Sequence, residues 1–383
     1  MKNYPHQDKF LADNPNKALL AWDTGTGKTY ASIMWIKARP NQNFLIIVPK
    51  NIKGKWLKDV EDYKLNALRI TVLTKEEYKK QNCTAIDGIV VDEADFFGSA
   101  LFMPGRSKLA EKLYSDIRNN NIKHVLLMTA TPFKSAPHTI HTLLSYIGNG
   151  PLWKDWQRAT YDLKMLPYLP RPAYIPNKGW RFYALDYAKP RMYTAKISDI
   201  ATVPTQHNDV IEIKTNKPTE ILSDNPTSEW HEYARAENGK EKLDWIKDYI
   251  RGKSKVVIVC RYKEQIATYA KELQKDREVF ILTGDTKNQD EEIRLAKESF
   301  ECVFLIQAGI GAGFQLAEKK SEYYNFSHMI FASMSFSHRD YVQMQGRILR
   351  GDALQENWYT YLIGGACDKS VHKRVMLGED FKL

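Results

Sequence analysis

The feature that most constrains the fold of this chain is an apolar run that ends in a short glycine-containing turn. The run, residues 18–22, has the length and composition of a buried parallel strand. Helical sequence follows the turn and ends before Pro40. A strand, a glycine loop and a helix start in this order direct backbone N–H groups and the positive end of a helix dipole towards one point. The sequence therefore predicts an α/β domain with a phosphate-binding loop.

The turn supplies side chains as well as backbone donors for a nucleotide. Lys28 is expected to reach the β- and γ-phosphates, and Thr29 is expected to offer its hydroxyl to Mg²⁺. The longer form of this pattern has a glycine six residues before the lysine. Because Trp22 stands at that position, the chain has a shortened form of the pattern. The predicted nucleotide-binding loop consists of Thr24, Gly25, Thr26, Gly27, Lys28 and Thr29.

Polar residues follow two further apolar runs. Residues 89–91 lead directly into an acidic cluster, and the carboxyl ends of parallel strands face the ligand crevice of an open α/β sheet. We therefore expect Asp92 to hold Mg²⁺ and Glu93 to orient and deprotonate the attacking water. Residues 124–128 end in Thr-Ala-Thr-Pro at 129–132, whose hydroxyls could contact the γ-phosphate or the acids, or could simply cap the strand.

The alternation of helix and strand starts again at about residue 239. Strands are expected at 256–260, 279–282, 302–306 and 329–332, so the second half predicts a second parallel sheet. A helix over 341–351 would carry two arginines three positions apart, on one face. Guanidinium groups bind phosphate oxygens in a forked geometry and suit the charge of a transferred phosphoryl group. The predicted catalytic residues are Lys28, Glu93, Arg347 and Arg350.

In this order along the chain, the segments resemble the motifs of superfamily-two helicases, and within them the Swi/Snf-type DNA translocases. The resemblance runs from residue 4 to about residue 381. DEAD-box RNA helicases carry Ser-Ala-Thr in motif III and a histidine opening motif VI, whereas this chain has Thr-Ala-Thr and Gln343. Motif V departs from the family, because it begins Gln-Ala-Gly-Ile. The matching segments are 4–7, 21–29, 46–56, 90–95, 129–132, 256–262, 307–316 and 343–351.

The resemblance implies an α/β fold of two tandem RecA-like parallel-sheet domains with an ATP cleft between them. It implies a first lobe at 1–150, a basic aromatic segment and hinge at 151–220, and a second lobe at 221–383. ATP and Mg²⁺ are the implied cofactors. Gln7 is implied to contact adenine, and Gly313 and Gln343 to join the nucleotide site. The implied nucleic-acid contacts are Lys50, Arg261, Thr286 and Gln307.

Composition agrees with a polyanionic partner, since the net charge is +10 and the isoelectric point is near 9.1. No run of about 18 consecutive apolar residues occurs, so no membrane span is expected. We expect an ATP-dependent translocase or helicase on duplex, forked or single-stranded DNA. We also expect a monomer in the cytoplasm, or in the host cytoplasm if a phage encodes the chain. The alternatives are an RNA helicase, a nucleotide-gated adaptor that recruits other proteins, and a motor subunit of a larger assembly.

Residues 151–196 differ in character, because aromatic residues are interleaved with lysines and arginines. These aromatics could stack on bases, or they could pack on the first lobe with the cations directed outwards. Their irregular spacing favours packing. The prolines around residues 216–226 indicate a hinge into the second lobe.

Overall fold

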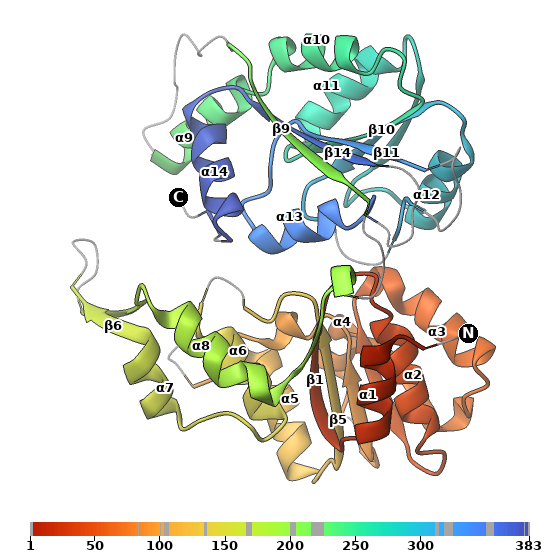
Figure 1. Ribbon diagram of the computed structural model, residues 1–383, viewed down its shortest axis with the longest axis vertical. Helices are drawn as coiled ribbons and strands as arrows, with labels where there is room; N and C mark the ends of the chain where they lie inside the picture. Colours follow the sequence, from red (N-terminus) through yellow and green to blue (C-terminus); the bar gives the residue numbers. More distant parts are fainter. Residues whose placement is uncertain are drawn as a thin grey trace. The chain divides into compact units, whose positions relative to one another are not determined.

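The chain folds as two compact units, Met1–Ile200 and Ala201–Leu383, each built around a parallel sheet (Figure 1). The computed structural model describes residues 3–82, 84–99, 101–102, 107–133, 136–165, 171–199, 204–215, 226–310, 314–317, 325–349, 356–378 and 380–381. The predicted hinge at 216–225 lies outside these residues. In the part of the chain so described, no helix is both long and apolar enough to cross a bilayer.

The first unit contains a sheet of six strands in the order β3-β2-β4-β5-β1-β8, and every ladder in it is parallel. The strands predicted at 18–22, 89–91 and 124–128 are confirmed as β1, β4 and β5. The bounds are β1 Lys17–Trp22, β2 Phe44–Val48, β3 Ile70–Thr74, β4 Gly88–Val91, β5 His124–Thr129 and β8 Tyr193–Ala195.

Helices cover both faces of this sheet because its strands are apolar on both faces. Leu19 and Val125 face one hydrophobic core, while Leu20 and Leu126 face the other. The helices of the unit are α1 Pro5–Asp13, α2 Lys28–Lys37, α3 Lys53–Asp62, α4 Lys75–Lys80, α5 Lys108–Asn119, α6 His138–Tyr146, α7 Trp153–Thr160 and α8 Trp180–Ala188.

The basic aromatic segment packs largely against the first unit. Trp156 of α7 and Trp180 of α8 are buried in the core that contains Leu127. A two-stranded antiparallel hairpin, β6 Tyr161–Lys164 and β7 Ala173–Pro176, lies between the two helices in the chain. After α8 the chain forms β8, which pairs with β1. The packing alternative therefore holds for these two tryptophans.

The second unit contains a sheet in the order β11-β12-β10-β13-β14-β9, again with parallel ladders only. The four predicted strands are confirmed as β10 to β13, and β9 and β14 extend the sheet at one side. The strand bounds are β9 Gln206–Glu212, β10 Lys255–Cys260, β11 Glu278–Leu282, β12 Cys302–Gln307, β13 His328–Phe331 and β14 Asn357–Ile363. The helices are α9 Pro226–Ala236, α10 Lys240–Tyr249, α11 Lys263–Leu273, α12 Gln289–Glu298, α13 His338–Gln345 and α14 Ala366–Met376.

The prediction of one helix over 341–351 is wrong, because α13 ends at Gln345. The carbonyls of Gly346 and Leu349 accept hydrogen bonds of 3.0 Å from Nε2 of Gln315. The carbonyl of Arg347 accepts from the backbone N–H of Leu316 at 2.8 Å. Acceptors that would continue the helix are thus bound by a neighbouring segment. Arg347 lies in the turn that follows, and Arg350 lies outside the described residues.

Candidate functional site

The loop after β1 has the backbone geometry of a phosphate cradle. Gly25 and Gly27 have φ angles of 83° and 82°, a region that residues with a side chain rarely adopt. Gly27 is the N-cap of α2, so the first N–H groups of that helix open onto the loop. A Cβ atom on Gly27 would collide with the amide of Gln7. The backbone conformation at Gly27 therefore requires glycine, and a side chain there would also displace the Gln7 amide.

The Lys28 side chain folds back over the loop. Its Nζ donates to the carbonyl of Trp22 at 2.8 Å and to the carbonyl of Asp23 at 3.0 Å. Desolvation lowers the pKa of Lys28, while the charges of nearby carboxylates raise it. A lysine ammonium thus lies among carboxylates at this edge of the sheet. The carboxylates that act on Lys28 belong to Glu93, Asp92, Asp23 and Asp95.

The acids after β4 are held in defined orientations. Oδ2 of Asp92 accepts a hydrogen bond of 3.0 Å from the indole Nε1 of Trp56, and Oδ1 accepts one of 3.0 Å from the backbone N–H of Glu93. Burial raises the pKa of Asp92, and the Trp56 bond and the Lys28 charge oppose that shift. Glu93 has a φ of 51°, which is uncommon for a residue with a side chain and is often found at functional sites.

Two threonines at the end of β5 contact the acidic cluster through Asp95. Thr129 Oγ1 donates to Oδ1 of Asp95 at 3.3 Å, and Thr131 Oγ1 lies 3.5 Å from Oδ2. Thr129 Oγ1 also accepts from the backbone N–H of Thr131 at 3.0 Å. Of the roles that the sequence left open for these hydroxyls, the structure shows two, contact with the acids and a local cap of the strand end.

The glutamine of α1 is bound to the loop. Gln7 Nε2 donates to the carbonyls of Thr26 and Gly27, at 3.2 and 3.5 Å, and its Oε1 accepts from the N–H of Tyr4 at 2.9 Å. His6 Nε2 also donates to the Thr26 carbonyl, at 3.0 Å. The predicted contact of Gln7 with adenine stays a prediction, since the amide bonds seen here go to the loop and to α1.

The segment after β8 is tied to the start of the same loop. The N–H of Asp23 donates to the carbonyl of Ala195 at 2.9 Å, and Oδ2 of Asp23 accepts from the N–H of Ile197 at 3.2 Å. Asp23 also offers its carbonyl to Thr26 Oγ1 at 2.7 Å. A shift of the loop would therefore disturb its hydrogen bonds with Ala195, the last residue of β8, and with Ile197.

The second unit holds Arg347 and Gln343 close to α13. Arg347 is 4% exposed, and its Nη1 donates to the carbonyl of Phe314 at 2.8 Å, with the guanidinium carbon 4.5 Å from the ring of the same residue. With its amide oriented by the hydrogen-bond pattern, Gln343 accepts from Nη2 and Nε of Arg339 at 3.1 and 3.2 Å. Gly313, predicted to join the nucleotide site, lies outside the described residues, as does Arg350.

Three predicted nucleic-acid contacts lie at the carboxyl ends of adjacent strands in the second sheet. Oε1 of Gln307 accepts from the N–H of Gly284 at 3.2 Å, which joins the ends of β12 and β11. Thr286 Oγ1 donates to the carbonyl of Ile281 within the turn after β11. Arg261, after β10, donates through Nε and Nη2 to the carbonyl of Met334. The structure thus brings Arg261, Thr286 and Gln307 to one edge, although these side chains bond within the protein.

The fourth predicted contact, Lys50, follows β2 in the first unit. It begins a short 3₁₀ turn after Pro49 and is exposed. Its position at the carboxyl end of β2 puts it on the same edge of the first sheet as the loop after β1, because all strands of that sheet are parallel.

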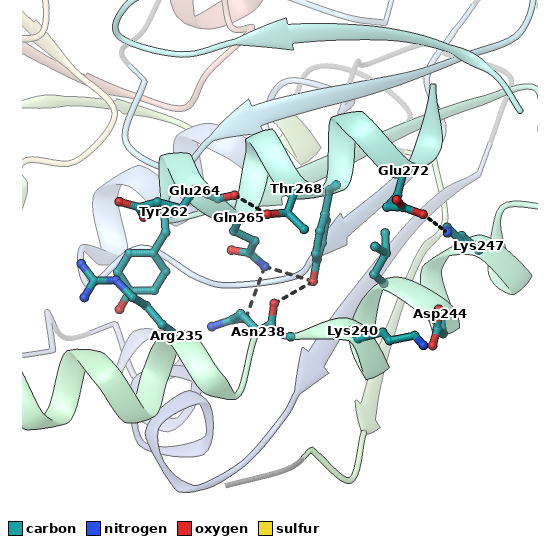
Figure 2. Close-up of a pocket in the computed structure, with 13 residues that line it drawn as sticks. Arg235, Asn238, Lys240, Asp244, Lys247, Tyr262, Glu264, Gln265, Thr268 and Glu272 are labelled. Carbon is teal, nitrogen blue, oxygen red and sulfur yellow. Dashed lines mark hydrogen bonds and ion pairs between the residues drawn. The ribbon is translucent and has the colours of Figure 1, made fainter. Parts of the chain in front are cut away.

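A separate cavity of about 620 Å³ lies in the second unit, among α9, α10 and α11. Figure 2 shows the residues that line it. Gln265 Nε2 donates to Tyr269 OH at 3.3 Å and to Oδ1 of Asn238 at 3.4 Å. At the other end, Lys247 pairs with Glu272 at 3.0 Å. These groups bond to one another, and no residue predicted for nucleotide or nucleic acid is among the described residues that line the cavity.

Trp56 and His6 are the site residues whose contacts sequence reasoning missed. Both belong to matching segments, but nothing in their spacing predicts that Trp56 donates to Asp92 or that His6 donates to Thr26. Trp56 is 1% exposed, and a buried indole N–H generally needs an acceptor. A tryptophan near the start of an amphipathic helix after a strand was therefore the sequence feature that could have indicated a hydrogen bond to a nearby acceptor.

Comparison with known proteins identifies the fold. No protein-family model matches the chain, and no curated protein matches it in sequence. Among solved structures, it resembles Saccharomyces cerevisiae Dbp5 bound to RNA and ADP BeF3, with a TM-score of 0.58, 14% identity, and 98% of this chain and 88% of that chain covered. A variant of that protein with valine in place of one leucine, also bound to RNA and ADP BeF3, gives a TM-score of 0.59 at 14% identity, with 99% and 88% covered.

The SWI2/SNF2 ATPase core of Sulfolobus solfataricus in complex with double-stranded DNA also aligns, with 14% identity and 98% and 91% of the two chains covered. Its TM-score is 0.42, too low to support an argument about this chain. The likeness to Dbp5 extends over both units. The chain therefore has the fold expected from its sequence, two tandem RecA-like α/β domains as in helicase cores.

Proposed function

We propose that this chain is an ATP-dependent motor that translocates along DNA or unwinds it. The observation that carries the proposal is that the glycine loop with Lys28 at the start of α2 and the acids Asp92 and Glu93 after β4 lie at the carboxyl edge of one parallel sheet. A glycine loop, a lysine at a helix start and acids at a strand end are the groups that phosphoryl transfer from a nucleoside triphosphate requires.

The residues of this cluster fit ATP and a magnesium ion. Gly25 and Gly27, at positive φ, shape the loop for backbone N–H contacts, and Lys28 adds a positive charge for the phosphates. The Thr29 hydroxyl and the Asp92 carboxylate are oxygen ligands of the kind that Mg²⁺ prefers. When bound, Mg²⁺ would neutralise charge that develops on the phosphate oxygens. The Trp56 hydrogen bond fixes the carboxylate of Asp92 for that task.

Glu93 is the proposed general base. Its carboxylate would orient the attacking water and take its proton, and the fixed backbone at a φ of 51° supports that positioning role. Arg347 and Arg350 would stabilise charge on the γ-phosphoryl group from the second unit. Closure of the two units on ATP and their release after hydrolysis would then move the chain along a strand.

DNA is the proposed track because motifs III and VI, with Thr129-Ala130-Thr131 and Gln343, resemble the Swi/Snf type more than the RNA helicases. The net charge of +10 supports a nucleic-acid partner of either kind. We further propose that the chain acts as a monomer. A role as a motor subunit or as an adaptor for other proteins would appear as a stable complex in size-exclusion chromatography.

The proposal is tested by phosphate release from ATP with single-stranded DNA, duplex DNA, forked DNA and RNA of equal length. DNA should stimulate hydrolysis by at least about tenfold, and Lys28→Ala should lower the stimulated rate on the order of 10²-fold or more. The matched control is Lys37→Ala, which removes an exposed lysine from the other end of the same helix and should leave the rate unchanged.

Two outcomes would contradict the proposal. Stronger stimulation by RNA than by every DNA would replace the DNA motor with an RNA helicase. Nucleotide binding without any stimulated phosphate release would favour the nucleotide-gated adaptor.

A further inference from the structure

The hairpin of β6 and β7 presents a continuous apolar face. Side chains alternate across a strand, and cross-strand partners share a face. Tyr161 pairs with Pro176, and two residues along, Leu163 pairs with Tyr174. These four side chains therefore lie on one side of the hairpin.

This face begins in the core and ends in solvent. Tyr161 is 7% exposed, and its hydroxyl lies 3.1 Å from Nδ1 of His138, so the inner end of the hairpin is fixed to α6. Leu163 and Tyr174 are 60% and 47% exposed, and Met165, directly after β6, is 66% exposed. The hairpin stands at the edge of the first unit, beside α7 and α8 (Figure 1). Its outer face is therefore apolar and uncovered.

The neighbouring helix α8 adds a second exposed apolar pair. Phe182 is 81% exposed and Leu185 is 47% exposed, and residues three apart lie on one side of a helix. Single exposed apolar side chains are common on protein surfaces, but several on adjacent elements indicate a surface that contacts another molecule.

The segment that carries this face is rich in cationic residues. Residues 151–199 contain nine lysines and arginines and four aspartates, with no glutamate. Lys164 is 57% exposed and lies 3.5 Å from Asp162, a solvent-exposed pair that leaves the local excess of positive charge in place. The exposed cations nearest in sequence to the hairpin are Lys154, Arg158, Lys164, Arg171 and Lys178.

An apolar face within a positively charged surface fits a polyanion that carries flat apolar groups. Single-stranded nucleic acid has this chemistry, because its phosphates are anionic and its bases stack on aromatic side chains. A duplex buries the faces of its bases in its own stack and would use only the cations.

We propose that the face formed by Leu163 and Tyr174 binds unpaired bases of single-stranded nucleic acid while the surrounding lysines and arginines contact its phosphates. This inference rests on the proposed function in one respect, namely that nucleic acid is the ligand of the chain. It adds a binding surface outside the matching helicase segments.

The test uses the full chain and a labelled oligothymidylate, with binding followed by fluorescence anisotropy. Tyr174→Ala together with Leu163→Ser should weaken single-strand binding about 5- to 100-fold. Tyr174→Phe should retain binding, because it keeps the ring that stacks. The matched control is Leu68→Ser, which alters a leucine that is 97% exposed elsewhere in the same unit and should have no effect.

A second readout distinguishes contact with bases from a general loss of binding. An oligonucleotide with 2-aminopurine should be quenched by the wild-type chain and by Tyr174→Phe, and should lose that quenching with Tyr174→Ala. Lys164→Ala should instead weaken single-strand and duplex binding alike and lower the salt slope by about 1.

Two results with the Tyr174→Ala, Leu163→Ser variant would overturn the inference. One is unchanged affinity for single strands with unchanged quenching, and the other is a loss of duplex binding as large as the loss of single-strand binding. These results would leave the proposed motor intact, since hydrolysis without nucleic acid should be the same in this variant and the wild type. Conversely, hairpin-dependent binding by a chain that hydrolyses no ATP would support this surface and contradict the motor. If the wild-type chain binds no nucleic acid, both proposals fail.

Discussion

The indole Nε1 of Trp56 donates a 3.0 Å hydrogen bond to Oδ2 of Asp92. Trp56 belongs to α3, and Asp92 follows β4, so the bond joins a helix on one face of the sheet to the acid at its carboxyl edge. Because Trp56 is only 1% exposed, its indole N–H depends on this acceptor for a hydrogen bond. The proposed metal ligand is thus oriented by a residue from a different segment.

Replacing Trp56 by phenylalanine should move the acid limb of the ATPase pH profile to higher pH. Burial raises the pKa of Asp92 and the Trp56 bond lowers it, so loss of the bond raises this pKa further. Asp92 must be ionised to hold Mg²⁺, and it loses that charge as pH falls through its pKa. A shift of about one unit is expected for a lost bond to a charged acceptor.

The measurement is turnover between pH 5 and 8 at saturating Mg²⁺, with Trp156→Phe as the control. Trp156 is also fully buried in the first unit, but its Nε1 has no hydrogen-bond partner among the described residues. Both variants lose similar volume, so a shift of the limb in both would mean that packing, not the hydrogen bond, is responsible.

Replacing Glu93 by glutamine should stop hydrolysis while leaving nucleotide binding nearly intact. The amide keeps the size of the side chain but cannot accept the proton of the attacking water, and general bases typically contribute 10²- to 10⁴-fold. Single-turnover phosphate release measures the first effect, and binding of a fluorescent ATP analogue measures the second. Glu76→Gln, at an exposed acid of α4, should change neither. Normal turnover in Glu93→Gln would remove this residue from the mechanism.

Replacing Arg347 by alanine should lower kcat on the order of 10³-fold and change ATP affinity only a few-fold, because charge on the γ-phosphoryl group is largest in the transition state. Arg347→Lys should recover only part of the rate, since an ammonium lacks the forked geometry.

The control for Arg347 is Phe314→Leu, which removes the ring 4.5 Å from the guanidinium and keeps the arginine. This variant should reduce kcat far less. An equal loss in Phe314→Leu would assign Arg347 to the folding of the second unit instead of to phosphate contact.

Replacing Lys242 by methionine should destabilise the second unit by about 3–5 kcal/mol, the usual cost of leaving one partner of a buried ion pair uncompensated. Lys242 is 0% exposed; its Nζ pairs with Asp368 and also donates to Asn238 Oδ1 at 2.7 Å and to the Ala332 carbonyl at 2.6 Å. These bonds join α10 to α14 and to the residue that follows β13.

Urea unfolding with hydrogen exchange in α10 and α14 would measure this loss. Lys240→Met, two residues earlier and exposed, should change stability by less than about 0.5 kcal/mol. Equal effects of the two substitutions would show that the buried network is dispensable.

Much of the fold could be predicted from local sequence because its strands are short, apolar and parallel. Residues 18–22, 89–91 and 124–128 are buried on both faces and are recognisable without tertiary information. β9 was not recognisable, because its sequence QHNDVIE is polar and the strand pairs with β14 at an edge of the sheet. β14 is largely buried, but it was not predicted. Its partner strands, β13 and β9, lie far from it in the sequence.

The residue at which α13 ends could not be predicted from local sequence either. The sequence from 341 to 351 has helical character apart from its glycines, yet Gln315 and Leu316 bind the carbonyls that a longer helix would use. A segment about thirty residues earlier in the chain thus determines where the helix stops.

The sequence by itself determined the two α/β halves, the glycine loop ending in Lys28 and the acids after β4, because local apolar patterns and backbone requirements specify them. Only the tertiary structure decided that Trp56 donates to Asp92, that Lys242 is buried beside Asp368, and that the hairpin leaves Tyr174 uncovered. Such contacts depend on the order of strands in a sheet and on which helix covers which face. That order brings together residues dozens of positions apart, and local patterns do not encode it.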